Sequence, residues 1–134
     1  MTYEAKMFLV IMGFEQHPDV ITNDLGVKPS KTWLKGDRVA NTQLTRKNNG
    51  WELASGLDAT QSTDAHLKAL MKIVSSNHNQ FKLICSKYNS QVSCAIYAGG
   101  SGEGNYVPFY LEKDLIQLCG EVGLEINCEF YPTP

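Results

Sequence analysis

The chain has 134 residues, 43% of them apolar, and a formal net charge of −2. This length fits one domain, residues 1–134, which can bury enough surface to fold without disulfides or a metal ion. The apolar fraction excludes a disordered chain, and the slight acidity argues against a nucleic-acid-binding protein, which carries a marked basic excess.

The first half of the chain predicts two strands, a helix and an extended segment. Met7–Met12 is continuously apolar, which is typical of a buried strand. Pro18 suits the first turn of a short helix, and Gly26 supplies its left-handed end. Lys31–Arg38 is expected to be extended but broken by a turn. Trp51–Leu57 alternates between apolar and small or polar residues, which predicts a further strand.

The middle of the chain predicts the clearest helix and a hairpin. Ser62 is a good N-cap, and the residues from Leu67 to Val74 carry an apolar stripe at helical spacing. Phe81–Tyr88 and Gln91–Ala98 are predicted as two strands joined by a tight turn.

The last part predicts a glycine-rich loop, a helix and a strand. Gly99–Asn105 is expected to be a flexible connection. The helix after Pro108 has an apolar side and ends at Gly123. In the final strand, the apolar residues from Leu124 to Phe130 should point inward, and the polar residues between them outward.

The predicted order is β-α-β-β-α-β-β-α-β. Short strands joined by hairpins favour a largely antiparallel sheet, with the helices gathered on one face. We therefore expect an α+β fold, a two-layer sandwich of ferredoxin-like type.

The chain resembles a widespread bacterial family that is catalogued as a domain of unknown function. The resemblance covers Met7 to about Tyr131, and its strongest marks are Lys35-Gly36-Asp37 and Gly50-Trp51-Glu52. It implies a small cytoplasmic α+β domain, usually standing alone. The family has no established catalytic residues, so none are transferred. By analogy, proteins of this size and type can act as immunity proteins beside toxins.

The sequence favours a cytoplasmic location. Met7–Met12 is too short to cross a bilayer or to form a secretory signal. The four cysteines are widely spaced, without a C-x-x-C pair, so free thiols in a reducing compartment are the simpler account. We expect no membrane contact.

No motif predicts a cofactor or a metal site. The glycines of Gly99–Gly104 do not match a P-loop, and the loop leads into an extended segment rather than a helix. His17, His66 and His78 lack a second ligand at metal-binding spacing. His66 shares a helical face with Leu70 and is expected at the boundary of the core.

No motif predicts a catalytic residue either. Ser55 and Ser101 lack the strand–turn–helix setting of a nucleophile elbow. Cys85, Cys94 and Cys128 are expected to pack on buried strand faces as small apolar groups.

The strongest functional signal is a segment rich in basic and aromatic residues. Between Lys28 and Lys47 there are six basic residues and one acid, and both tryptophans lie within or just after this segment. The candidate binding residues are Trp33, Lys35, Asp37, Arg38, Trp51 and Glu52. The structural alternatives are a core role for Trp51 and a simple turn at Lys35-Gly36-Asp37, while the exposure of Trp33 is open.

The favoured function is a non-catalytic protein-binding or inhibitory module, of which an immunity protein is one form. Aromatic and basic residues dominate interface energetics, which motivates this choice. The alternative is a small-molecule-binding protein or enzyme with a cleft near Gly99–Asn105. Nucleic acid is not expected as a partner. The chain is expected to be a monomer or a homodimer.

Overall fold

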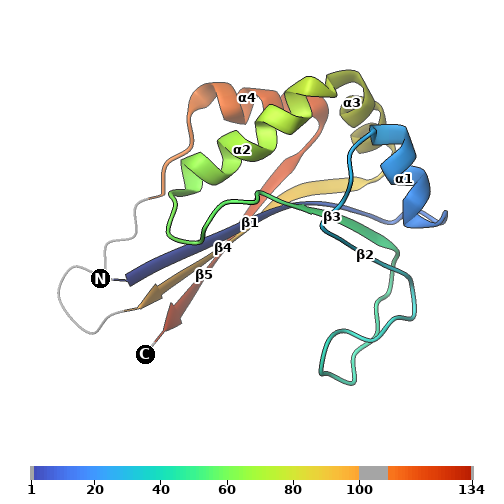
Figure 1. Ribbon diagram of the computed structural model, residues 1–134, viewed down its shortest axis with the longest axis horizontal. Coiled ribbons are helices and arrows are strands. Elements are labelled where there is room, and N and C mark those ends of the chain that lie inside the picture. Colours follow the sequence, from blue (N-terminus) through green and yellow to red (C-terminus); the bar gives the residue numbers. More distant parts are fainter. Residues whose placement is uncertain (1, 100–108, 134) are drawn as a thin grey trace.

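A computed structural model of the chain describes residues 2–99 and 109–133 (Figure 1). The strands are β1 (Thr2–Met12), β2 (Lys31–Trp33), β3 (Gly50–Ala54), β4 (Asn89–Gly99) and β5 (Glu125–Thr133). The helices are α1 (Pro18–Leu25), α2 (Thr63–Ser76), α3 (His78–Lys87) and α4 (Lys113–Val122).

The five strands form one sheet in the order β2-β3-β1-β4-β5. Every neighbouring pair is antiparallel except β4 and β5, which run parallel and are separated in the chain by α4. The four helices lie over one face of the sheet and leave the other face without a helix in the described part of the chain (Figure 1). The predicted two-layer α+β sandwich with a largely antiparallel sheet is confirmed.

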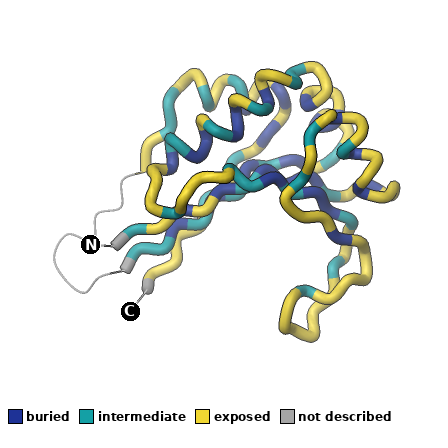
Figure 2. Tube along the Cα trace, in the orientation of Figure 1, coloured by how far each residue is buried: buried dark blue, intermediate teal, exposed yellow. Residues whose placement is uncertain are grey.

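The core lies between this sheet and the helices (Figure 2). Alternation along β1 turns Ala5, Met7, Leu9 and Ile11 toward the helices, where all four are buried. The apolar stripe of α2 meets them with Leu67, Leu70, Met71 and Val74, also all buried. One face of each element thus closes the core, and the apolar stripe of α2 is the one that the helical spacing in the sequence predicts.

Local signals set the ends of several helices. The Ser62 side chain accepts a hydrogen bond from the Ala65 N–H at 3.1 Å and so caps α2. Pro18 begins α1, which ends at Gly26 in the left-handed conformation with φ 71°. Gly123 ends α4 in the same way, with φ 93°. These boundaries agree with the sequence prediction.

One predicted element is wrong. Phe81–Tyr88 was expected to be a strand of a hairpin, but residues 78–87 form the helix α3. Phe81, Ile84 and Cys85 are its buried residues, and their spacing of three and four is helical. Periodicity alone does not separate a short buried helix from a strand. The observed order is therefore β-α-β-β-α-α-β-α-β, and Cys85 lies on a helix.

The end of β5 also departs from expectation. Leu124 is buried, but Phe130, which was expected to be inside, is 56% exposed. The far end of β5 extends beyond the helices (Figures 1 and 2), so its alternation continues without a covering layer. Apart from Gly99, the predicted loop at Gly99–Asn105 lies outside the described residues. Within the described residues, no helix is both long and apolar enough to span a membrane.

Candidate functional site

The segment between β2 and β3, residues 34–49, projects from the body of the protein, and we name it the arm (Figure 1). It folds back on itself as an irregular hairpin. The Gly36 N–H donates to the Arg46 carbonyl at 2.9 Å, and the Val39 N–H donates to the Leu44 carbonyl at 2.8 Å. The arm is therefore an ordered hairpin that extends outward from the ends of β2 and β3.

Asn49 anchors the base of the arm. Its carboxamide oxygen accepts from the Lys35 N–H at 2.7 Å. Its amide nitrogen donates to the carbonyls of Glu15 at 3.2 Å and Gln16 at 2.9 Å. One side chain thus ties both ends of the arm to the connection between β1 and α1.

Trp33 forms the apolar floor at the start of the arm. It lies opposite Gly50 in the pairing of β2 with β3. Its indole covers the space where a side chain at Gly50 would stand, and it is only 8% exposed. The Arg46 guanidinium carbon lies 4.1 Å from the centre of the indole ring, and the Lys31 amine lies 5.9 Å away. Both are cation–π distances, so two positive charges lie close to one indole ring.

The arm also carries a pocket of about 360 Å³. Its lining residues are Met12, Trp33, Val39, Leu44, Thr45, Arg46, Lys47 and Asn48. The side chains of Met12, Trp33, Val39 and Leu44 are apolar, whereas Arg46 and Lys47 are cationic. We call this the arm pocket. It is suited to an apolar group that carries negative charge beside it.

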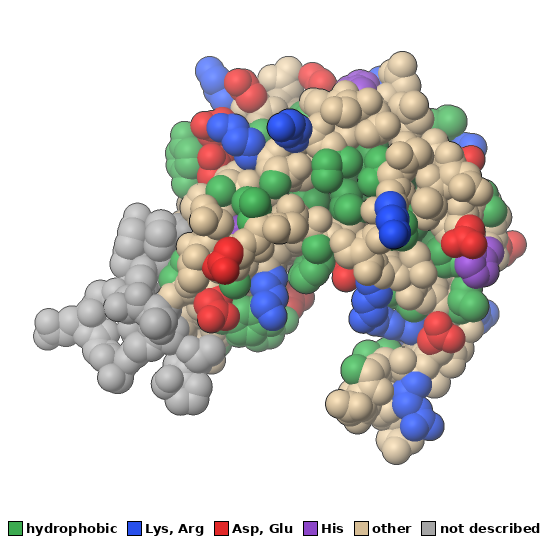
Figure 3. All heavy atoms as spheres, viewed as in Figure 1, with side chains coloured by type: hydrophobic (Ala, Val, Ile, Leu, Met, Phe, Trp, Pro, Cys, Tyr) green, Lys and Arg blue, Asp and Glu red, His purple; other side chains and the backbone are tan. Residues whose placement is uncertain are grey.

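Within the described chain, no cation of the arm forms an ion pair with an acid, although the Glu52 carboxyl lies close enough to Arg46 to interact with its charge. Lys35, Arg38 and Lys47 are exposed. Among the described residues, the one ion pair joins His17 and Asp19 at 3.5 Å, far along the chain from these cations. Figure 3 shows blue side chains along the projecting arm and a hollow beside it. The arm therefore offers exposed positive charge to a partner.

The predicted binding residues do not form one group: Lys35, Asp37 and Arg38 lie on the arm, whereas Trp51 lies in the core. Lys35 and Arg38 are exposed on the arm. The Asp37 carboxylate accepts from the Leu34 N–H at 2.8 Å, which is the turn role considered from the sequence. Trp51 points the other way: it is fully buried in the core, and its indole N–H donates to Thr22 Oγ1 at 3.0 Å.

Glu52 lies at the margin of the arm site. It is opposite Lys31 in the strand pairing and half-buried. Burial raises the pKa of its carboxyl above the ordinary value, and the positive charges of Lys31 and Arg46 oppose that rise. The structure therefore brings Trp33, Lys35, Arg38 and Glu52 to one region and separates Trp51 from them.

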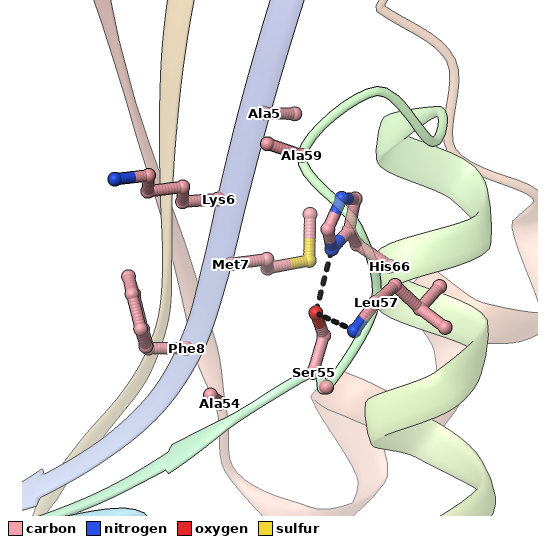
Figure 4. Close-up of a pocket in the computed structure, with 10 residues that line it drawn as sticks. Ala5, Lys6, Met7, Phe8, Ala54, Ser55, Leu57, Ala59 and His66 are labelled. Carbon is pink, nitrogen blue, oxygen red and sulfur yellow. Dashed lines mark hydrogen bonds between the residues drawn. The ribbon is translucent and has the colours of Figure 1, made fainter.

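A second site, which the sequence analysis did not predict, pairs Ser55 with His66 (Figure 4). Ser55 Oγ lies 2.6 Å from His66 Nδ1, and the Leu57 N–H donates to the same Oγ at 3.3 Å. His66 was expected at the boundary of the core but is only 1% exposed. The pair adjoins a pocket of about 400 Å³ between β1 and the chain that follows β3.

The environment of His66 favours its neutral form. Burial lowers the pKa of the imidazole, and the carbonyl and carboxylate of Asp58 partly oppose this effect. One hydrogen bond joins Ser55 Oγ and His66 Nδ1, and which of the two donates depends on the tautomer of the imidazole. His66 Nε2 has no hydrogen-bond partner among the described side chains and backbone.

We assign a structural role to the Ser55–His66 pair. A histidine that activates a serine is itself held by a third group. The Asp58 carboxylate instead accepts from the Thr60 N–H and hydroxyl, at 2.8 and 2.6 Å. The Ser55–His66 bond fastens the turn after β3 to α2. No sequence motif marks it, because the two residues lie on different elements.

The described residues contain no group of three or more histidine, cysteine, aspartate or glutamate side chains placed to hold a metal ion. Four thiols are present, and none is paired in a disulfide. Cys85, Cys94 and Cys119 are buried, and Cys128 is half-buried.

Comparison with known proteins gives one match. A family model described as "Domain of unknown function (DUF4279)" matches residues 2–133. No curated protein and no solved structure matches the chain.

Proposed function

The chain belongs to this family, whose description names no activity, and we propose that it is a non-catalytic module that binds an acidic protein through the arm. The observation that carries the proposal is the arm pocket, where an apolar floor that includes Trp33 lies beside Arg46 and Lys47. A partner surface with an exposed apolar side chain among carboxylates would fill and neutralise it.

The energetics favour such a partner over a purely electrostatic one. Interface energy concentrates in a few apolar and arginine contacts that exclude water, and surrounding charges mainly set the association rate. Leu44, which is 68% exposed, and Leu34, which is 40% exposed, are the apolar groups that a partner would cover on the arm.

A narrower form of this function is an immunity-type inhibitor that blocks a toxin. We also propose that the protein works in the cytoplasm, because its four cysteines are free thiols, as a reducing compartment would keep them. Co-expression with the product of the neighbouring gene tests the narrower form. Growth rescue by the wild-type chain, lost in an arm variant, is the expected result.

The direct test is differential capture from host lysate, followed by calorimetry with the purified partner. The arm variant reverses three exposed charges: Lys35→Glu, Arg38→Glu and Lys47→Glu. The matched control reverses three exposed lysines on α2 and α3: Lys68→Glu, Lys72→Glu and Lys82→Glu. Both variants change the net charge equally, so non-specific electrostatic binding falls equally in both.

We expect an acidic protein to bind the wild type and the control, and its affinity to fall at least about tenfold in the arm variant, more at low salt. The same proteins bound equally by all three forms would contradict the proposal. Capture of RNA or DNA in place of a protein, detected by nuclease sensitivity, would also contradict it.

A further inference from the structure

β5 presents an unusually long free edge. Among the described strands it pairs with β4 alone, and it spans nine residues. The opposite edge of the sheet, β2, has three residues. Short edge strands protect a sheet from pairing with another chain, whereas a long unpaired strand invites it. The β2 edge is therefore protected by its shortness, whereas the β5 edge is long enough to pair with another strand.

Large apolar side chains are exposed on β5, beside its free edge. Phe130 is 56% exposed and Tyr131 is 41% exposed, and Figure 2 shows this end of β5 as exposed. The Phe109 ring packs edge-on against Phe130 with centroids 6.0 Å apart, and Phe109 is itself 42% exposed. Large aromatic side chains gathered at an open strand edge are typical of a contact surface.

We propose that β5 pairs antiparallel with β5 of a second copy of this chain, joining the two sheets into one. Homodimers of this kind have two-fold symmetry, so the same stretch must pair with itself. If the helices of both copies lie on one face of the joined sheet, residues opposite each other must point to the same side. Because side chains alternate along a strand, two opposed residues are then an even number of positions apart in the sequence. The two-fold axis therefore passes through a position where a residue lies opposite its own copy.

The charges on β5 select the register. With the centre at Cys128, Asn127 lies opposite Glu129 of the second copy, and Glu125 lies opposite Tyr131. On the helix side, Ile126 lies opposite Phe130. Every opposed pair between residues 125 and 131 is therefore apolar with apolar, thiol with thiol, or acid with a neutral polar group, and these are compatible cross-strand pairs.

The neighbouring registers place like charges together. A centre at 127 sets Glu125 against Glu129 of the second copy, and this occurs twice by symmetry. A centre at 129 sets Glu129 against itself. Like charges directly opposite are destabilising, so both registers are disfavoured. Pro132, which has no N–H to donate, falls outside the paired stretch.

This self-complementarity is what indicates a second copy and not an unrelated strand. The two glutamates disfavour the registers centred at 127 and 129, and a centre at 130 would bring Pro132, which has no N–H to donate, into the paired stretch. The interface lies at the opposite edge of the sheet from the arm, so this inference does not depend on the proposed partner.

The first test is the mass of the protein in solution by light scattering over the micromolar range. The chain has a mass of 14.9 kDa, and we expect twice that value. Asn127→Glu should shift the protein to the monomer, because the new carboxylate lies opposite Glu129 of the second copy at two symmetric positions. Adding Glu129→Lys should restore the dimer by placing opposite charges there.

Asn23→Glu on the exposed side of α1 is the matched control and should stay dimeric. Asn127 and Glu129 are exposed, so the variants should fold, which circular dichroism checks. A monomeric wild type would overturn the proposal. So would an Asn127→Glu variant that stays fully dimeric.

The second test fixes the register by a disulfide between the two copies of Cys128. Directly opposed residues of an antiparallel pair have Cα atoms about 4.5–5.5 Å apart, which a disulfide can bridge. Cys94 lies opposite Cys128 on β4 and competes for it, so the experiment uses the Cys94→Ala variant. Cys85 and Cys119 are buried, whereas Cys128 is half-buried, so neither of the first two should react.

Mild oxidation of Cys94→Ala should give a covalent dimer on a non-reducing gel, and Cys94→Ala with Cys128→Ser should give none. A dimeric protein that forms no such link would contradict this register and this interface.

Discussion

At the scale of single residues, Gly50 and Trp33 form one packing unit. They are opposed in the pairing of β3 with β2, and a Cβ at Gly50 would overlap the six-membered and pyrrole parts of the Trp33 indole. The absence of a side chain at position 50 lets the indole lie against the sheet. Arg46 then stacks on the indole. The floor of the arm pocket therefore depends on a glycine.

Gly50→Ala should expel the Trp33 ring and cost about 1–3 kcal/mol of unfolding free energy through overpacking. Trp33 fluorescence should shift toward the red as the ring meets water. The matched control is Gly120→Ala on the exposed side of α4, where nothing lies within 4 Å of the new Cβ. That substitution should stabilise by about 0.5–1 kcal/mol, because alanine favours a helix. Equal effects of the two substitutions in urea unfolding would refute this account.

At the scale of elements, the arm keeps its place through side-chain contacts more than through sheet pairing. β2 contributes three residues to the sheet, and the arm adds one isolated bridge between Arg38 and Thr45. Of the three hydrogen bonds of the Asn49 side chain, one holds Lys35 within the arm, and two join the arm to Glu15 and Gln16 in the connection before α1. The arm should therefore be able to open without unfolding of the core.

Asn49→Asp tests this. The carboxylate keeps the shape and the acceptor toward the Lys35 N–H, but it loses the two donated bonds and faces two carbonyl oxygens. We expect faster amide hydrogen exchange throughout residues 34–48, corresponding to about 1–3 kcal/mol of local stability, with little change in β1 or β4. Asn48→Asp, on an exposed neighbour, is the control. Uniformly faster exchange in the whole sheet would contradict local opening.

At the scale of the whole molecule, stability depends on keeping one neutral histidine inside the core. His66 lies on α2 and holds the turn after β3 through Ser55. Its pKa in the folded state is lowered from 6.5 by burial, so the unfolded chain binds a proton more readily than the folded chain does. The contribution of neutral His66 is therefore complete above about pH 6.5 and is lost as the pH falls below that value.

We expect the free energy of unfolding to decrease from pH 7 to about pH 5, and this decrease to be smaller in His66→Gln. The pKa of the neighbouring Asp58 is lowered from 3.8, so its protonation falls below this range. His78→Gln, which removes a histidine at the start of α3, is the control for the substitution itself. Urea unfolding at each pH provides the measurement. An identical slope in wild type and His66→Gln would show that His66 does not govern the pH response.

Much of the fold could be predicted because its signals are local. Ser62 marks a helix start through its side-chain acceptor, and Gly26 and Gly123 mark helix ends through their left-handed backbone. The apolar run of Met7–Met12 identifies a buried strand. The helix α3 was missed because Phe81, Ile84 and Cys85 form too short an apolar pattern to distinguish from a strand. Its neighbours in space, α1 and α4, decide it.

The candidate site, like the fold, could be predicted only in part from the sequence. By itself, the sequence determined the α+β class, the family resemblance, and the basic character of the segment that became the arm. Only the tertiary structure decided that Trp33 and Trp51 face opposite sides of the sheet, that Ser55 meets His66, and that β5 is left at an edge. Composition and periodicity act within a few residues, whereas these arrangements depend on which strands and helices meet, and such contacts join residues far apart in the chain.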